Sequence, residues 1–172
     1  MSVKKILTEP NKLLRQVSKS VDRVGPEEKT LMDDMLDTMY NAPGIGLAAI
    51  QIGIPKRIIV MDISSDKNKK EPRYFVNPII KNRNEEKAKY EEGCLSVPDQ
   101  FAEIERPNSC EVEYLDYEGK KQLLKADGLL ATCIQHEMDH LEGILFIDYL
   151  SKLKKSMIIK KLSKIKSNRK IL

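Results

Sequence analysis

The spacing of hydrophobic residues predicts two helices near the start of the chain. Between residues 26 and 41, apolar positions recur every three or four residues, at Leu31, Met32, Met35, Leu36 and Met39. This spacing places them on one face of an amphipathic helix, and methionines at such positions indicate a packed core rather than a cofactor site. A shorter helix is predicted for residues 11–18, directly after Pro10.

Strand patterns follow these helices. A β-branched run at residues 57–63 predicts a strand, and a polar, lysine-rich turn follows it. Two apolar runs, residues 74–76 and 79–80, then flank the dipeptide Asn77-Pro78. This arrangement predicts a strand that is either interrupted or placed at the edge of a sheet.

A hairpin and one further helix complete the predicted fold. Residues 110–117 alternate apolar and acidic side chains and, after a turn, continue into residues 120–125, which predicts a hairpin with one solvent-exposed face. Asp127 can then cap a helix that Gly143 would end. We therefore predict an α+β fold, with short antiparallel strands around a central helix, N-terminal helices and a C-terminal basic helix.

Length and composition indicate one globular domain. The chain has 172 residues, of which 41% are hydrophobic and 33% are charged, which is enough for a hydrophobic core. The sequence contains neither the apolar core of a signal peptide nor a membrane-spanning run. Three cysteines at irregular spacing argue against a disulfide framework. We expect a cytoplasmic protein without membrane attachment.

The two histidines of the chain provide the first chemical signal. His136 and His140 are one helical turn apart, so their rings project from the same face and can bind one metal ion. Glu137 lies beside that face, where a carboxylate can take a proton from metal-activated water. A helix that carries these residues by chance is the alternative, but two buried imidazole rings need partners that a metal would supply. The central helix is thus predicted to bind a hydrolytic metal.

A catalytic metal usually has three protein ligands, so one more is required. Phe146 stands where a metzincin protease would carry a histidine. Glu142 and Asp148 are too close in sequence to be the downstream glutamate of a thermolysin-like protease. The third ligand is therefore expected upstream, and it is a cysteine or a carboxylate.

Among the cysteines, Cys94 is the preferred ligand. It follows Gly93, which lets the backbone bend, and a thiolate binds transition metals strongly. Cys133 lies three residues before His136, so it would crowd three ligands onto one helix face. Cys110 alternates within a predicted strand and is interpreted as a core residue.

A glycine-rich segment lies between the N-terminal helices and the first strand. Residues 44–55 include three glycines and two alanines, which indicates backbone that another group must approach closely. Gly44-x-Gly46 lacks the third glycine and the strand-turn-helix context of a dinucleotide-binding motif. A nucleotide site is therefore not predicted.

Three motifs of the chain resemble those of the peptide deformylase family, in the same order and at similar separations. They are Gly44-Ile-Gly-Leu-Ala-Ala-x-Gln51, Glu92-Gly-Cys-Leu-Ser96 and Gln135-His-Glu-x-Asp-His-Leu141. The resemblance extends over essentially the whole chain. It implies an enzyme that removes the N-formyl group from the initiator methionine of nascent bacterial proteins.

The resemblance also implies the roles of the site residues. Cys94, His136 and His140 would bind one divalent metal ion, which is commonly ferrous iron in this family, although zinc, nickel or cobalt could occupy such a site. Glu137 would take a proton from the attacking water and return it to the departing amine. The Gln51 side chain and the Leu95 backbone N–H would stabilise the formyl oxygen.

Substrate contacts follow from the same resemblance. The residues expected to bind the formylmethionyl peptide are Ile45, Gly46, Gly93, Leu129 and Cys133. The chain departs from common family residues at three positions that do not bind the metal, namely Ile50, Phe101 and Thr132. Phe101 stands where many members carry an arginine, so contacts beyond the first substrate residue are expected to differ.

The C-terminal segment concentrates positive charge. Residues 151–172 contain nine lysines and arginines and no acid, and because the whole chain carries +4, the first 150 residues carry −5. An apolar stripe is expected to dock this helix: Leu150, Leu153, Met157, Ile158, Leu162 and Ile165. The family resemblance implies that its basic face contacts ribosomal RNA, whereas a merely solvated face is the alternative.

We interpret residues 1–150 as a catalytic domain and residues 151–172 as a basic helix or tail of that same domain, in a monomeric protein. Two other functions remain open. A general zinc metallopeptidase would share the histidine helix but would usually recruit histidine or glutamate as the third ligand. A non-catalytic ribosome-associated protein with a structural metal would need a fourth protein ligand.

Overall fold

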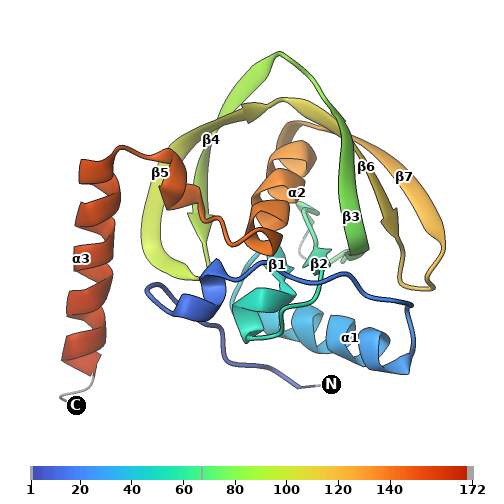
Figure 1. Cartoon of the computed structure of the whole chain (residues 1–172), viewed down its shortest axis with the longest axis horizontal. Helices are drawn as coiled ribbons and strands as arrows, with labels where there is room; N and C mark the ends of the chain where they lie inside the picture. Colours follow the sequence, from blue (N-terminus) through green and yellow to red (C-terminus); the bar gives the residue numbers. More distant parts are fainter. Residues whose placement is uncertain (1, 67, 170–172) are drawn as a thin grey trace.

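The strands form a five-stranded sheet and a long hairpin (Figure 1). We describe a computed structural model, which covers residues 2–66 and 68–169. The larger sheet has the order β1-β2-β3-β6-β7, made of β1 (Gly46–Ala48), β2 (Ile58–Met61), β3 (Arg73–Arg83), β6 (Ser109–Leu115) and β7 (Lys121–Asp127). The hairpin consists of β4 (Lys87–Cys94) and β5 (Val97–Pro107). Neighbouring strands are antiparallel, which confirms the α+β prediction.

Three α-helices and three short 3-10 helices accompany the strands in the described part of the chain. The α-helices are α1 (Pro26–Asn41), α2 (Gly128–Leu141) and α3 (Lys152–Arg169), and the 3-10 helices are η1 (Lys12–Arg15), η2 (Ala49–Ile52) and η3 (Phe146–Tyr149). The helix predicted for residues 26–41 has these same bounds. The helix predicted for residues 11–18 is only η1, whose first turn is capped by the Asn11 side chain. No helix among the described residues combines the length and apolarity needed to cross a membrane.

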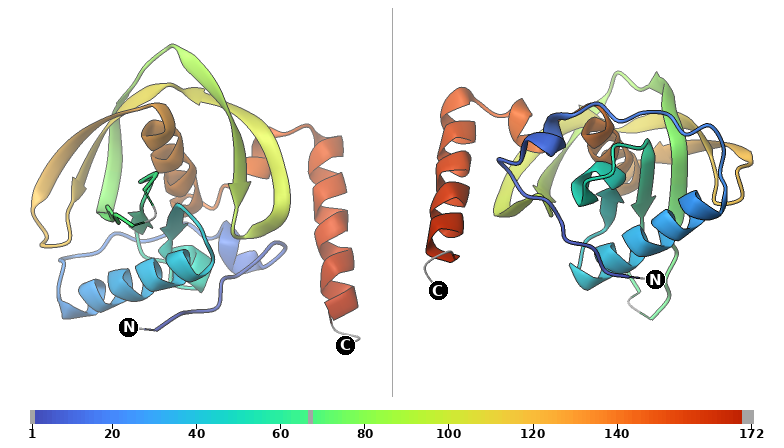
Figure 2. Two further views of the ribbon diagram at one scale, coloured as in Figure 1. Left: turned by 180° about the vertical axis from the view of Figure 1, so that it is seen from behind. Right: turned by 60° about the horizontal axis from the view of Figure 1, so that its bottom comes forward.

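The five-stranded sheet lies between α1 and α2 (Figure 2). Side chains of a strand alternate between faces, so Ile59 and Met61 of β2 join the cluster around α2. Ile58 and Val60 join the cluster around α1. Each fully buried aliphatic side chain stabilises the fold by about 1.5–3 kcal/mol. The two clusters therefore hold α2 and α1 against opposite faces of the sheet.

The Asn77-Pro78 dipeptide interrupts β3 but does not lie in an edge strand. β3 pairs with β2 on one side and β6 on the other, and its register with β6 shifts between Val76 and Ile79. Asn77 has a positive φ of 50°, and its side chain accepts a bond from the Val21 N–H (2.8 Å) and donates one to the Val21 carbonyl (2.7 Å). The predicted interruption is correct and the edge alternative is wrong, because the bulge and the Asn77 bonds absorb the proline inside the sheet.

A third apolar cluster joins the β4–β5 hairpin to η3 and α3. Leu162 is the buried residue of α3 in this cluster, and Ile158 and Ile159 pack against it. Leu153 and Met157 remain 71% and 50% exposed, so these two members of the predicted stripe do not dock. The helix rests on the domain along a narrower line than its sequence suggested.

Candidate active site

Helix α2 positions the predicted metal ligands inside the molecule. Asp127 is its N-cap residue, although its side chain makes no capping hydrogen bond, and the helix ends before Gly143, which has a positive φ of 72°. A side chain at Gly143 would also clash with the backbone of Arg15. Both the positive φ and this close contact therefore require glycine at this position. Along this helix His136 and His140 are 8% and 0% exposed, respectively.

The three predicted ligands converge. The Sγ atom of Cys94 lies 3.3 Å from Nε2 of His140. One potential ligand atom from each of Cys94, His136 and His140 lies within 4.8 Å of the others. Neither alternative cysteine joins this cluster of ligand atoms. Cys110 belongs to the core cluster between the sheet and α2, and Cys133 lines the same cavity as Cys94 but directs its Sγ toward the Ile45 carbonyl, 4.0 Å away.

Glu92 fixes the ring of His136. Its Oε1 lies 2.8 Å from His136 Nδ1, which leaves Nε2 as the ring nitrogen available to a metal. The Arg106 guanidinium binds both Glu92 oxygens, at 2.7 and 2.9 Å. Burial by itself would raise the pKa of Glu92, but His136 and Arg106 hold it below its ordinary value. Glu92 is therefore a carboxylate that orients the imidazole.

Arg106 extends this network toward the surface. It donates a hydrogen bond of 2.9 Å to Asp139 of α2, and its guanidinium lies 4.9 Å from the centre of the Tyr149 ring. The Tyr149 hydroxyl donates a 2.7 Å bond to the same carboxylate. Arg106 is only 4% exposed, so its charge is compensated almost entirely by protein groups. Glu92 and Asp139 are in the sequence motifs, but no sequence signal indicated Arg106.

Burial and neighbouring positive charge control the pKa of the His140 ring. Burial, followed by the charge of the His136 ring, holds the pKa of His140 well below its ordinary value. The ring is therefore neutral and has a lone pair to offer. A neutral imidazole is the form that binds a metal.

Glu137 lies against the glycine-rich segment. A side chain at Gly46 would overlap its carboxylate, so the absence of one makes room for Glu137. Glu137 is 4% exposed, and its Oε2 is buried without a hydrogen-bond partner. Burial raises the pKa of this carboxyl to about 7. The expectation that a group closely approaches the glycines is confirmed.

Gln51 and Leu95 flank the same centre. The Gln51 side chain is buried, accepts a bond from the Ala48 N–H (2.9 Å), and donates to Ser96 Oγ (3.1 Å) and to Cys94 Sγ (3.5 Å). Leu95 packs over Gly44, where a side chain would clash with it at 2.7 Å.

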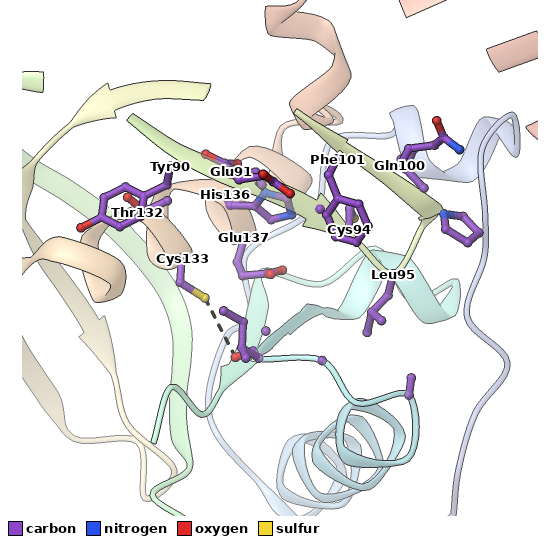
Figure 3. A pocket seen from close by; sticks show the side chains of 18 of the residues that line it. Tyr90, Glu91, Cys94, Leu95, Gln100, Phe101, Thr132, Cys133, His136 and Glu137 are labelled. Carbon is purple, nitrogen blue, oxygen red and sulfur yellow. Dashed lines mark hydrogen bonds and ion pairs between the residues drawn. The ribbon is translucent and has the colours of Figure 1, made fainter. Parts of the chain in front are cut away.

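These residues surround one cavity of about 620 Å³ (Figure 3). All predicted site residues except His140 line it: Ile45, Gly46, Gln51, Gly93, Cys94, Leu95, Leu129, Cys133, His136 and Glu137. Ile45 and Leu129 are 48% and 44% exposed, whereas Cys133 is 5% exposed. Thr132 and Phe101, two of the departures from common family residues, also line the cavity, whereas Ile50 is fully buried in the core.

Comparison with known proteins relates the chain to one family. A sequence model of the polypeptide deformylase family matches residues 3–156. A peptide deformylase of Pelagibacter ubique is 87% identical over 169 residues, and the alignment covers 98% of this chain and 98% of that relative. The one from Rhizobium meliloti is 53% identical, covering 98% of this chain and 97% of the relative.

Solved structures of peptide deformylases also match the fold of this chain. The crystal structure of the peptide deformylase from Ehrlichia chaffeensis has a TM-score of 0.91 and 42% identity, covering 96% of this chain and 97% of that one. A structure of the Ehrlichia protein in complex with actinonin has a TM-score of 0.90 and 45% identity, covering 95% and 98%. The chain therefore belongs to the peptide deformylase family, the metal-dependent enzymes that remove the formyl group from the N-terminal methionine of nascent proteins.

Proposed function

We propose that this chain hydrolyses the formyl group of formylmethionyl peptides with a divalent metal ion held by Cys94, His136 and His140. The observation that carries the proposal is the convergence of these three side chains beside a buried carboxylate, Glu137, at a cavity that Cys94, His136 and Glu137 line. Three protein ligands leave a coordination position for water or substrate, as hydrolysis requires.

The donor atoms fit such a metal. With metal–sulfur and metal–nitrogen bonds of about 2.3 Å and about 2.1 Å, ligand atoms of a tetrahedral site lie about 3.6 Å apart. The 3.3 Å between Cys94 Sγ and His140 Nε2 is close to this value. Thiolate and imidazole suit Fe2+, Zn2+, Ni2+ and Co2+, and we propose ferrous iron as the native ion. When bound, the metal would activate a water molecule and polarise the formyl carbonyl.

Glu137 moves the proton in this proposal. Its unpartnered Oε2 accepts a proton from the attacking water and then delivers it to the departing amine nitrogen. The Gln51 amide and the Leu95 N–H donate hydrogen bonds to the formyl oxygen as negative charge develops on it. One such donor contributes about 3 kcal/mol to transition-state stabilisation in other hydrolases. The long Gln51 contact to Cys94 Sγ, 3.5 Å, leaves that donor able to turn to substrate.

The cavity supplies the substrate contacts. We propose that the backbone groups of Ile45, Gly46 and Gly93 bind the peptide in an extended conformation. The methionine side chain would lie against Leu129 and Cys133, which lie on α2 two turns and one turn, respectively, before the ligand His136. The apolar wall suits a flexible thioether.

The remaining assignments concern the whole chain. We propose a cytoplasmic monomer in which residues 1–150 form the catalytic domain and residues 151–172 its basic extension. The exposed lysines of α3 support contact with ribosomal RNA phosphates. Lys170 of this extension lies outside the described residues. Co-sedimentation with ribosomes should weaken steeply as salt is raised, and salt-independent or absent co-sedimentation would contradict this contact.

One experiment tests the proposed activity. The protein is purified anaerobically, its metal content is measured, and formate release from formyl-Met-Ala-Ser is followed on the same sample. Unformylated Met-Ala-Ser serves as the control substrate, and actinonin, the compound in the Ehrlichia complex, serves as a competitor. We expect one metal per chain, rapid formate release that actinonin inhibits, and no cleavage of the control. Cleavage of Met-Ala-Ser would instead favour the general metallopeptidase.

A further inference from the structure

The segment that precedes α1, residues 7–18, contacts all three sequence motifs of the active site. Its backbone N–H groups donate hydrogen bonds to one carbonyl of each motif: Leu7 to Gln51 (2.7 Å), Glu9 to Ser96 (2.8 Å) and Ser18 to Leu141 (2.8 Å). Figures 1 and 2 show this segment beside the turn of the β4–β5 hairpin and the end of α2. Residues 7–18 therefore connect the parts of the chain that carry the proposed metal ligands.

Arg15 joins this segment to the chain that leaves α2. Its backbone carbonyl packs so closely against Gly143 that no side chain would fit there. Its guanidinium donates to the Gly143 carbonyl (3.4 Å) and to the Asp148 carboxylate of η3 (2.5 Å). Asp148 also accepts a bond from the ammonium group of Lys155 on α3 (2.6 Å). Arg15 is therefore held between the end of α2 and η3.

Glu9 is a second carboxylate partner of Arg15. Its Oε1 lies 3.4 Å from Nη2 of Arg15, and the residue is only 7% exposed. Its Oε2 is buried and accepts no hydrogen bond from the described residues. A buried carboxylate is costly unless a cation compensates its charge. Arg15 therefore holds Glu9 in its buried position, and with it the backbone N–H that donates to Ser96.

Ser96 belongs to the turn that carries Cys94 and Leu95. The Ser96 N–H donates to Cys94 Sγ (3.4 Å), and the Ser96 hydroxyl accepts the bond from the Gln51 amide (3.1 Å). A displaced Ser96 would therefore move the proposed thiolate ligand and both proposed donors to the formyl oxygen. A displacement of about 1 Å at a reacting centre can slow a reaction about a hundredfold.

We propose, building on the deformylase function above, that Arg15 and Glu9 are positioning residues for the reaction. They connect the end of α2, which carries His140, to the turn that carries Cys94, and so they set the distance between these two ligands. Neither Arg15 nor Glu9 lines the cavity. Without the pair the turn moves relative to α2, which lowers kcat and alters the metal centre but leaves substrate binding intact.

Kinetics of the metal-loaded full chain with formyl-Met-Ala-Ser test this role. Arg15→Gln removes the cation, and Glu9→Ala removes its partner. We expect each variant to lower kcat about tenfold and to change KM by less than about twofold, because the lost interactions act only in the transition state. The double variant R15Q/E9A should be about as slow as the single variants, since the two residues act through one contact. Arg15→Lys keeps the charge and should recover part of the loss.

The Co2+-substituted protein gives a readout that does not depend on turnover. Its visible absorption bands report the arrangement of the thiolate and imidazole ligands, and we expect them to shift in Arg15→Gln. Arg57→Gln is the matched control, because the Arg57 guanidinium also binds the end of α2, through Glu142 (2.6 Å), but does not pair with Glu9 in the described part of the chain. Arg57→Gln should therefore leave kcat, KM and the Co2+ spectrum unchanged.

The outcomes separate this inference from the proposed function. Parent-like kcat and Co2+ spectra in folded Arg15→Gln and Glu9→Ala overturn the positioning role and leave deformylation intact. An equal loss in Arg57→Gln also overturns it, because any weakening of the end of α2 would then slow the reaction. Absence of formate release by the metal-loaded parent overturns the proposed function itself. Thermal unfolding of each variant verifies that the measurements come from folded protein.

Discussion

The two helices that end the chain, α2 and α3, differ in how much of their surface the fold uses. Nine of the 14 residues of α2 are buried, and they include both predicted histidine ligands. Among residues 152–167 of α3, whose side chains the structure describes, only Leu162 is buried. Most residues of α2 are therefore constrained by core packing or by the metal site. Most residues of α3 face solvent, so their charge can serve contacts with other molecules.

The largest predicted effect lies on α2. Glu137→Gln keeps the shape of the side chain but removes its ability to accept a proton. We expect formate release to fall by about a thousandfold, as for other general bases. Metal content should be unchanged, because Glu137 is not a proposed ligand. Near-normal turnover by the metal-loaded variant would exclude Glu137 as the proton carrier.

The second-largest predicted effect concerns the ion pairs of Arg106 with Glu92 and Asp139, which connect the hairpin to α2. Arg106→Met leaves Glu92 and Asp139 without their cation, and breaking a buried ion pair costs about 3–5 kcal/mol. We expect urea denaturation to show a loss of this size. Metal affinity should also fall about 10–100-fold, because Glu92 no longer orients His136. Arg106→Lys retains the charge but loses the two hydrogen bonds to Glu92. Its stability and its metal affinity should therefore lie between those of Arg106→Met and those of the parent protein. An unchanged metal affinity in folded Arg106→Met would show that the network is structural only.

A pair of matched substitutions measures the docking of α3. Leu162→Ala removes the buried contact and should destabilise the docked helix by about 2 kcal/mol. Leu153→Ala, at a site that is 71% exposed, should change stability by less than about 0.5 kcal/mol. Amide hydrogen exchange along residues 152–167 measures how much each substitution destabilises the docked helix. Equal effects of the two substitutions would mean that α3 docks differently.

The smallest predicted effect serves as a reference outside both helices, at Asp62, which follows strand β2. Burial would raise the pKa of this carboxyl, but the Tyr40 hydroxyl (2.6 Å) and the Ser64 and Glu71 N–H groups lower it to about 2. The folded pKa is thus below the unfolded value of about 3.9, so the stabilisation is complete above that value and is lost as pH falls toward 2.

Tyr40→Phe tests this carboxylate. It removes one donor and should lower stability by about 1.5 kcal/mol at pH 7, because hydrogen bonds to charged groups have about this value. Urea denaturation of parent and variant should converge between pH 4 and pH 2, as Asp62 becomes protonated. The Lys70 contact with the ring, 4.3 Å from its centre, does not need the hydroxyl and acts as an internal control. A difference that persists at pH 2 would mean that the hydroxyl acts through another group.

The regions that the sequence did and did not predict differ in physical kind. The spacing of Met35 and Met39 defined α1 correctly, because its apolar face is buried against the sheet. The β4–β5 hairpin was missed because its buried face mixes apolar residues with Glu92 and Arg106, whose partners on α2 are distant in sequence. In α3 the apolar Leu153 was assigned to a docking face, yet a single line of contact leaves it exposed. Burial of charged groups and the width of a helix contact are tertiary properties, which periodicity does not encode.

The most direct test of the metal centre is X-ray absorption at the metal edge of the anaerobically prepared protein. Coordination by Cys94, His136 and His140 predicts one sulfur at about 2.3 Å and two imidazole nitrogens at about 2.1 Å, with the sulfur lost in Cys94→Ser. A spectrum without sulfur, or a shell made of four protein ligands with no place for water, would contradict the account.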